Sequence, residues 1–242
     1  MCVLLVSWRQ RSDFPLVLAA NRDEAYARPA RRPEVVRAGN TWALAPRDLT
    51  AGGTWIGVAA TGLVVAITNR RDGDFDAARP SRGHLCRLAL EQPDAAAVQR
   101  FLVAETGARA YNSFNLLHAD RDRAWVTSWN GTLQSTELRP GVAVLSNEHA
   151  LGEVVSPGLA VLQDAGGALA ELREALQSFA ERHEPEPESG LVICKHGATH
   201  GTVSSSLVFV PASAAAWIEY AAGPPCCTGF AIHTLHSTGR VP

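Results

Sequence analysis

Short apolar runs of β type, separated by polar or glycine-containing turns, lie on both sides of a helical stretch in the chain. Two pairs of runs predict hairpins. A series of four runs predicts an antiparallel meander in which Asn130-Gly131 is a strong turn signal. The predicted strands are residues 2–8 and 15–21, residues 54–59 and 63–68, the meander from 114 to 147, and four later runs at 191–194, 204–210, 215–221 and 229–235.

Three segments between these runs have helical character. Ser81 is a capping residue for a helix that reaches about residue 91, and Pro93-Asp94 opens a second helix that ends near residue 105. A third helix spans about residues 167–183, where apolar side chains recur at helical spacing. Strands, then helices, then strands predict a layered α+β fold with helices outside two sheets, and we interpret residues 1–242 as one domain.

Composition, charge and cysteine count argue against several classes of protein. The 242 residues are 46% hydrophobic, which suffices for a sizeable core, and 22 Lys plus Arg against 24 Asp plus Glu give a net charge of −2. This balance argues against a nucleic-acid partner. No apolar run approaches the ~20 residues that span a bilayer, so we expect no membrane span. Five cysteines, an odd number, without an export signal favour a reducing, cytoplasmic location.

Cys2 is the leading candidate for a catalytic nucleophile. It follows the initiator Met, and removal of that Met would leave a cysteine whose own α-amine, with a pKa of about 7.7–8.0, can act as its base. One residue would then supply both nucleophile and base. The alternative is that Cys2 is a small apolar residue at the start of a buried strand.

The predicted N-terminal hairpin gives Cys2 polar neighbours. A loop centred near residues 11 and 12 makes facing positions sum to about 23, which places Cys2 opposite Asn21 at the start of the tetrad Asn21-Arg22-Asp23-Glu24. Because side chains alternate between the two faces of a strand, Asn21 and Asp23 should point to the same face as Cys2 and Arg22 away from it. The alternative is that the tetrad is a solvated strand end or a salt-bridged turn, which are common settings for Asn, Asp and Arg.

These residues resemble a known family. The tetrad, with the other motifs in the same order and spacing, resembles the NRDE family, also called the transport and Golgi organisation family, from the first residue to about residue 210. The motifs are Met1-Cys2, Asn21-Arg22-Asp23-Glu24 with Arg28-Pro29, Arg47-Asp48-Leu49, residues 52–58, Thr68-Asn69-Arg70, Ser81-Arg82-Gly83, Tyr111, Phe114-Asn115-Leu116 and Leu145-Ser146-Asn147.

The resemblance implies a four-layer αββα sandwich like that of N-terminal nucleophile (Ntn) hydrolases, distantly related to cholylglycine hydrolase and penicillin V acylase. It implies that Cys2 is the nucleophile, that Arg22 and Asp23 orient it, and that Asn69 and Asn147 help to bind the oxyanion. Asn21, which opens the tetrad, completes the candidate catalytic set. The expected activity is hydrolysis or acyl transfer at a non-peptide amide.

The sequence departs from the pattern of the family and of the related acylases at two places, and the resemblance also allows a second function. Val203 stands where the family commonly has Arg, and Arg22 and Asp23 are adjacent whereas the related acylases separate them. Members of the family are also linked to haem trafficking, lipid metabolism and Golgi organisation. The alternative is therefore a non-enzymatic protein that binds or carries haem or a lipid on the same fold.

Two groups of cysteine and histidine residues are candidate metal ligands. The first group is Cys226-Cys227 with His233 and His236, but adjacent cysteines lack the spacing of a zinc claw. The second is Cys194, His196 and His200, which have the character of a strand and loop. We therefore predict no metal site and no cofactor. The expected partner is a small-molecule amide or an apolar ligand such as haem.

Overall fold

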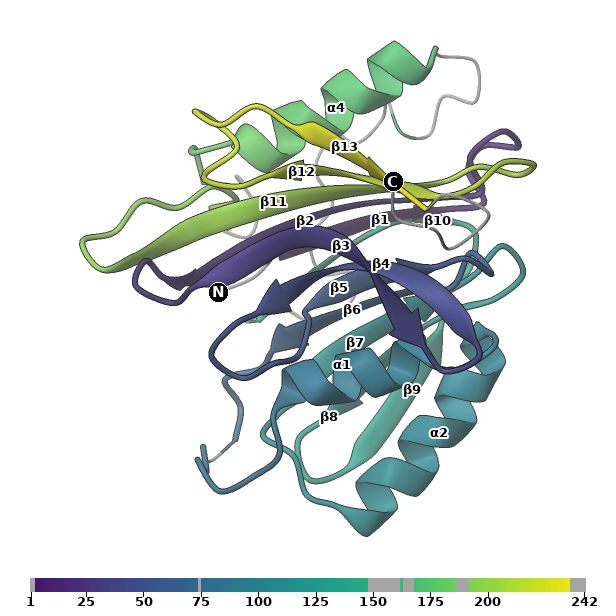
Figure 1. Cartoon of the computed structure of the whole chain (residues 1–242), viewed down its shortest axis with the longest axis vertical. Coiled ribbons are helices and arrows are strands. Elements are labelled where there is room, and N and C mark those ends of the chain that lie inside the picture. Colours follow the sequence, from purple (N-terminus) through teal and green to yellow (C-terminus); the bar gives the residue numbers. More distant parts are fainter. Residues whose placement is uncertain (1–2, 74, 148–161, 163–167, 186–191, 236–242) are drawn as a thin grey trace.

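Two antiparallel β-sheets pack face to face, and helices cover their outer faces (Figure 1). The structure is a computed structural model, which describes residues 3–73, 75–147, 162, 168–185 and 192–235. The first sheet has the order β10-β1-β2-β11-β12-β13 and the second the order β3-β4-β5-β6-β7-β8-β9. The first sheet contains β1 (Val3–Trp8), β2 (Leu16–Ala25), β10 (Gly141–Ser146), β11 (His200–Val210), β12 (Trp217–Ala221) and β13 (Ala231–Thr234). The second contains β3 (Ala30–Ala38), β4 (Thr41–Asp48), β5 (Ile56–Ala59), β6 (Val64–Asn69), β7 (Phe114–Ala119), β8 (Ala124–Trp129) and β9 (Leu133–Glu137).

The apolar core has three layers. One lies between the sheets, one lies under α1 (Arg82–Leu90) and α2 (Ala95–Ala108), and one lies under α4 (Leu169–Glu181). Both faces of β1 are therefore covered, which explains why its residues 3–6 are all apolar instead of alternating with polar ones. The two sheets and the helices on their outer faces make four layers, which confirms the predicted αββα sandwich.

Helix α1 begins where the sequence predicts, because the Ser81 hydroxyl accepts a hydrogen bond from the Gly83 amide. Asp94 caps α2 in the same way, through the Ala97 amide at 2.7 Å. Among the described residues, no helix is both long and apolar enough to cross a membrane.

Four details differ from the sequence-based prediction. Strands β3 and β4 were not predicted, because β3 lies at a sheet edge and its burial follows no regular alternation. Strand β10 leaves the meander and pairs with β1 in the other sheet. Of the predicted strand at 191–194, the described residues 192–194 are not in a strand, and β2 continues through the tetrad instead of ending at it.

Candidate functional site

The N-terminal hairpin has a register one residue away from the predicted one. Val3 lies opposite Asn21, so facing positions sum to 24 rather than 23. The last pair of the hairpin is Trp8 and Leu16, which leaves a loop of residues 9–15 that is centred on Ser12, whereas the prediction centred it between residues 11 and 12. The partner of Asn21 is therefore Val3, and the predicted pairing of Cys2 with Asn21 is wrong. The argument that placed Asn21 and Asp23 on the same face as Cys2 rested on that pairing and fails with it. Cys2 lies outside the described residues.

The start of β1 is flanked by two of the motifs. Val3 pairs with Asn21 of β2 on one side and with Ser146 of β10 on the other. Asn21 precedes Arg22 and Asp23, and Ser146 precedes Asn147. The tetrad and the Asn147 motif, more than a hundred residues apart in the sequence, therefore adjoin the same end of one strand.

Asn21 points into the layer between the first sheet and α4. Its Nδ2 donates to the carbonyl oxygens of Ala180, at 2.8 Å, and Ile193, at 3.1 Å, and its side chain is buried. These two bonds tie the strand to the end of α4 and to the segment that precedes β11. The contacts of Asn21 are those of a residue that holds the layers in place.

Arg22 points the other way, toward the second sheet. Its guanidinium carbon lies 4.2 Å from the centroid of the Trp55 ring, and its Nη2 is 3.6 Å from Asp48 Oδ2. Asp48 also accepts hydrogen bonds from Arg28 and from the amide of Thr50. Burial opposes ionisation of Asp48, but these bonds prevail and hold its pKa below the usual value. The carboxylate thus remains charged between two arginines.

Asp23 is almost fully enclosed. Thr202 Oγ1 donates to Asp23 Oδ1 at 2.7 Å, and Lys195 Nζ lies 3.2 Å from Oδ2. Burial raises the pKa of Asp23 above its usual value, while the charge of Lys195 and the hydrogen bond from Thr202 oppose that increase. The site therefore contains a carboxylate whose pKa is raised because burial outweighs the positive charge and the hydrogen bonds around it.

Two adjoining pockets open around Asp23. The first, about 330 Å³, is the Arg22 pocket, and the second, about 950 Å³, is the Asn147 pocket. Asp23, Glu24, Asn69, Phe75 and Arg82 line both. The two pockets are therefore parts of one continuous cleft of a size that suits a small-molecule ligand.

Asn69 and Asn147 converge on this cleft from different sheets. Asn69 is the last residue of β6 and is exposed, whereas Asn147 follows β10 and is buried. Both line the Asn147 pocket together with Asp23. Of the predicted site residues, the structure brings Asp23, Asn69 and Asn147 to one cavity and Arg22 to the adjoining one.

Several residues of the cleft were not assigned a role from the sequence. Trp55, Asp48 and Arg82 belong to the motifs that carry the family resemblance, so the motifs indicated their place. Two of these motifs are in backbone contact, since the Thr54 amide donates to the Gly83 carbonyl at 3.1 Å. Position 53 must be glycine for this approach, because a Cβ on Gly53 would collide with the backbone of Gly83. Lys195 belongs to no motif, and only the fold brings it to Asp23.

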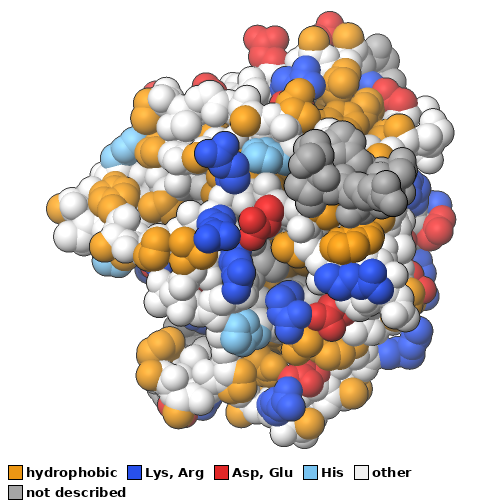
Figure 2. Space-filling view, viewed as in Figure 1, with side chains coloured by type: hydrophobic (Ala, Val, Ile, Leu, Met, Phe, Trp, Pro, Cys, Tyr) orange, Lys and Arg blue, Asp and Glu red, His pale blue; other side chains and the backbone are white. Residues whose placement is uncertain are grey.

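Val203, the position where the family commonly has Arg, lies at a β-bulge. The register of β11 on β2 shifts between Thr202 and Ser204. Val203 lines a groove of about 780 Å³ together with Arg22, Arg31 and Arg32. Figure 2 shows Lys and Arg side chains gathered in the middle of the face that carries β3 and β4. An arginine at position 203 would add a charge to a groove that already contains several.

Comparison with known proteins identifies the family. The family described as Transport and Golgi organisation 2 matches residues 1–192. The chain belongs to this family. The bovine Transport and Golgi organization protein 2 homolog is 31% identical over 160 residues, which cover 61% of this chain and 57% of the bovine protein. The human homolog is 30% identical over 159 residues with the same coverage. The match thus spans less than two thirds of the length of these relatives.

Solved structures of low sequence identity share the fold of this family member. Penicillin V acylase from Agrobacterium tumefaciens superposes with a TM-score of 0.58 at 12% identity, covering 98% of this chain and 86% of the acylase. A variant of conjugated bile acid hydrolase from Clostridium perfringens gives 0.57 at 11%, covering 100% and 99%. The Caenorhabditis elegans N-acylethanolamine-hydrolyzing acid amidase ortholog gives 0.54 at 14%, covering 97% and 100%. The fold is Ntn-hydrolase-like, as the resemblance implied.

Proposed function

We propose that the protein is an N-terminal-cysteine amidohydrolase or acyltransferase that acts on a non-peptide amide. The supporting observation is the start of β1, where Val3 pairs with Asn21 and Ser146, the residues next to Arg22 and Asn147. Residue 2 is bonded to Val3, and consecutive Cα atoms are about 3.8 Å apart. Chain connectivity therefore favours a thiol close to the cleft that Asp23, Asn69 and Asn147 line.

The proposed reaction proceeds through a thioester. After removal of Met1, the α-amine of Cys2 accepts the thiol proton, and the sulfur attacks the carbonyl carbon of the amide. The side-chain amides of Asn69 and Asn147 donate hydrogen bonds to the oxyanion. The α-ammonium then protonates the leaving amine as the C–N bond breaks. Water hydrolyses the thioester, or an acceptor amine takes the acyl group.

The roles of Asp23 and Arg22 differ in this proposal. Asp23, paired with Lys195, accepts a hydrogen bond from the α-amine of Cys2 and orients it. Arg22, held by Trp55 and Asp48 in the adjoining pocket, positions the strand and the substrate. The pocket linings support this division, because Asp23 lines both pockets whereas Arg22 lines only the first of the two.

The decisive experiment compares thiol reactivity and activity in one preparation. Intact mass should show that Met1 is absent, and iodoacetamide should label Cys2 before the buried Cys86 and Cys194. Burial strongly raises the pKa of Cys86, which makes it a slow internal reference. Cys2→Ser should abolish hydrolysis of a suitable amide. Asn69→Ala or Asn147→Ala should lower kcat by about 10²- to 10³-fold, because each removes one donor to the oxyanion. The exposed Cys227→Ser is the matched control and should remain active.

Two results would overturn the proposal. Quantitative retention of Met1 removes the base, because the α-amine is then on the wrong residue. Labelling of Cys2 no faster than Cys86 or Cys194 shows that its thiol is not activated. The second result, with ligand affinity unchanged in Cys2→Ser, is the behaviour that the alternative, a haem- or lipid-binding protein, predicts.

A further inference from the structure

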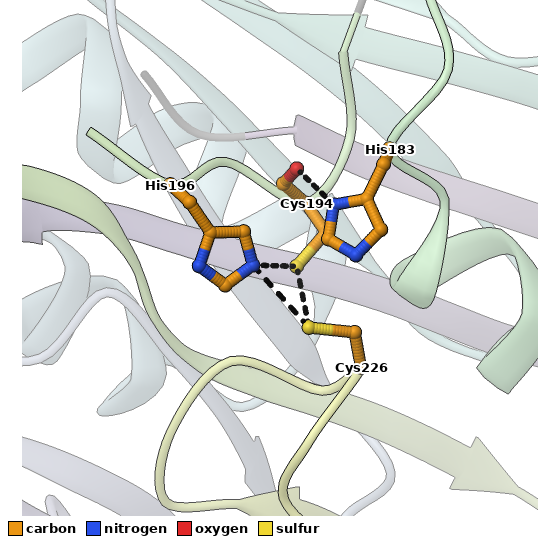
Figure 3. A group of neighbouring side chains, drawn as sticks. All are labelled: His183, Cys194, His196 and Cys226. Atoms are coloured by element: carbon orange, nitrogen blue, oxygen red, sulfur yellow. Dashed lines mark hydrogen bonds between the residues drawn. The ribbon is translucent and has the colours of Figure 1, made fainter.

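Four potential metal ligands meet beside the Asn147 pocket. They come from three separate parts of the chain: His183 follows α4, Cys194 and His196 precede β11, and Cys226 lies between β12 and β13 (Figure 3). One ligand atom from each residue lies within 4.8 Å of all the others. Three of the four ligands lie beyond residue 192, where the family match ends.

We propose that these four residues form a structural Zn²⁺ site. Cys194 Sγ lies 3.7 Å from Cys226 Sγ and 3.7 Å from His196 Nε2, and His196 Nε2 lies 3.3 Å from Cys226 Sγ. With Zn–S near 2.3 Å and Zn–N near 2.0–2.1 Å, a tetrahedral site has vertices about 3.8 Å apart for two sulfurs and about 3.6 Å apart for sulfur and nitrogen. The three contacts match the edges of such a tetrahedron.

The fourth ligand is held in a suitable tautomer. His183 Nδ1 lies 3.2 Å from the carbonyl oxygen of Cys194. A carbonyl oxygen only accepts, so Nδ1 is the protonated nitrogen and Nε2 has the free lone pair. Histidine ligands in zinc sites commonly donate their other ring nitrogen in this way. The bond also joins two of the ligands to each other.

The chemistry of the set selects the ion. Two thiolates and two imidazoles in a tetrahedron favour zinc over magnesium or calcium, which prefer oxygen ligands. Each cysteine releases its thiol proton on binding, so two thiolates neutralise the two charges of Zn²⁺. Four protein ligands leave no open position for a water, which makes the site structural rather than catalytic.

The site would stabilise a part of the chain that has little regular structure. Among the described residues 192–199, the only bridge is between His196 and Gly201, and Cys194 donates its amide to the Arg182 carbonyl at 2.8 Å. Lys195 lies between two of the ligands and pairs with Asp23. Zinc would therefore fix the lysine that contacts the candidate site. The proposal does not depend on any activity of Cys2.

Metal analysis of the purified protein tests the site directly. We expect about one zinc per chain, lost on treatment with a chelator under reducing conditions. Co²⁺ added to the stripped protein should give the intense ligand-field bands of a tetrahedral ion and sulfur-to-cobalt charge transfer, and Zn²⁺ should abolish both. Absence of zinc together with an octahedral Co²⁺ spectrum would overturn the proposal.

Variants assign the ligands. Cys226→Ser, at the surface, should reduce zinc content to near zero and remove the charge-transfer band, whereas the neighbouring Cys227→Ser should retain both. His196→Ala should lose zinc, whereas the matched His200→Ala should retain it. Equal zinc in Cys226→Ser and Cys227→Ser contradicts the assignment. A Cys194–Cys226 disulfide in protein that was purified with zinc would instead identify a redox pair and exclude the zinc site.

Discussion

Strands β2 and β11 pair along their whole length, but the two halves of this pair differ in chemistry. Residues 16–20 of β2 face residues 206–210 of β11, and nearly all of these side chains are apolar and buried. Residues 21–25 face residues 200–205, where Asn21, Arg22 and Thr202 are buried although they are polar or charged. Asp23 is half-buried as a residue, but its side chain is only 3% exposed.

The polar half is the more costly half to fold. Among the described residues of this half, Asn21 Oδ1 and the hydroxyl of Ser205 have no hydrogen-bond partner. Each buried unsatisfied group costs about 1–3 kcal/mol. The apolar half offsets this cost through burial in two core layers. One strand pair therefore combines a stabilising half with a half that contributes Arg22, Asp23 and His200 to the cleft.

The largest effect should follow from a cavity in the apolar half. Leu18 is fully buried between the sheets, and Leu18→Ala should lower the free energy of unfolding by about 2–5 kcal/mol. Urea unfolding measures this change. Val103→Ala, at a side chain that is 57% exposed on α2, is the control and should change stability by less than about 0.5 kcal/mol. Equal effects at the two positions would contradict the comparison.

A smaller effect should follow at the boundary between the halves. Asn21→Ala leaves the carbonyl groups of Ala180 and Ile193 without their donor. It should therefore lower the free energy of unfolding, measured in urea, by about 1–3 kcal/mol. Asn69→Ala, at an exposed side chain of the same type, should cost less than about 0.5 kcal/mol. If both variants were equally stable, Asn21 would not hold α4 against the sheet.

The layers could be predicted from the sequence because they follow from local patterns. Ser81 and Asp94 are capping residues, and Asn130-Gly131 provides a turn in which Gly131 has a positive φ of 99°. The partner of β10 could not be predicted. A strand that crosses from one sheet to the other makes its hydrogen bonds with residues far away in the sequence, and no local signal records that choice.

The candidate site was predicted only where motifs carried it. Asn69 and Asn147 came from the family resemblance, and Asp23 came from the predicted hairpin as well as from the resemblance. Lys195 and the ligand cluster lie outside the motifs. In the sequence, the ligands look like two separate and incomplete sets. One is Cys194 with His196, and the other is Cys226 with Cys227. Pairing of β11 with β12 brings them together, and the position of His183 after α4 completes the set.

The smallest effect concerns pH and the polar half alone. The pKa of folded Asp23 is raised above 3.8, so between 3.8 and that raised value the folded state binds more protons than the unfolded state. The contribution of Asp23 to stability is therefore present at low pH and is lost as pH rises through this window. Asp23→Asn has no such loss, so its stability relative to the wild type should increase across the window and then become constant.

Urea unfolding of both proteins from about pH 3 to about pH 7 measures this difference, because pH effects elsewhere in the molecule cancel in the comparison. A second variant, Lys195→Met, tests how the charge of the lysine affects the pKa of Asp23. The charge of Lys195 lowers the pKa of Asp23, so removing it should raise that pKa further and extend the window to higher pH. A difference that decreases with pH would mean that the ion pair outweighs burial, and that Asp23 is a stabilising carboxylate like Asp48 rather than a strained group in the cleft.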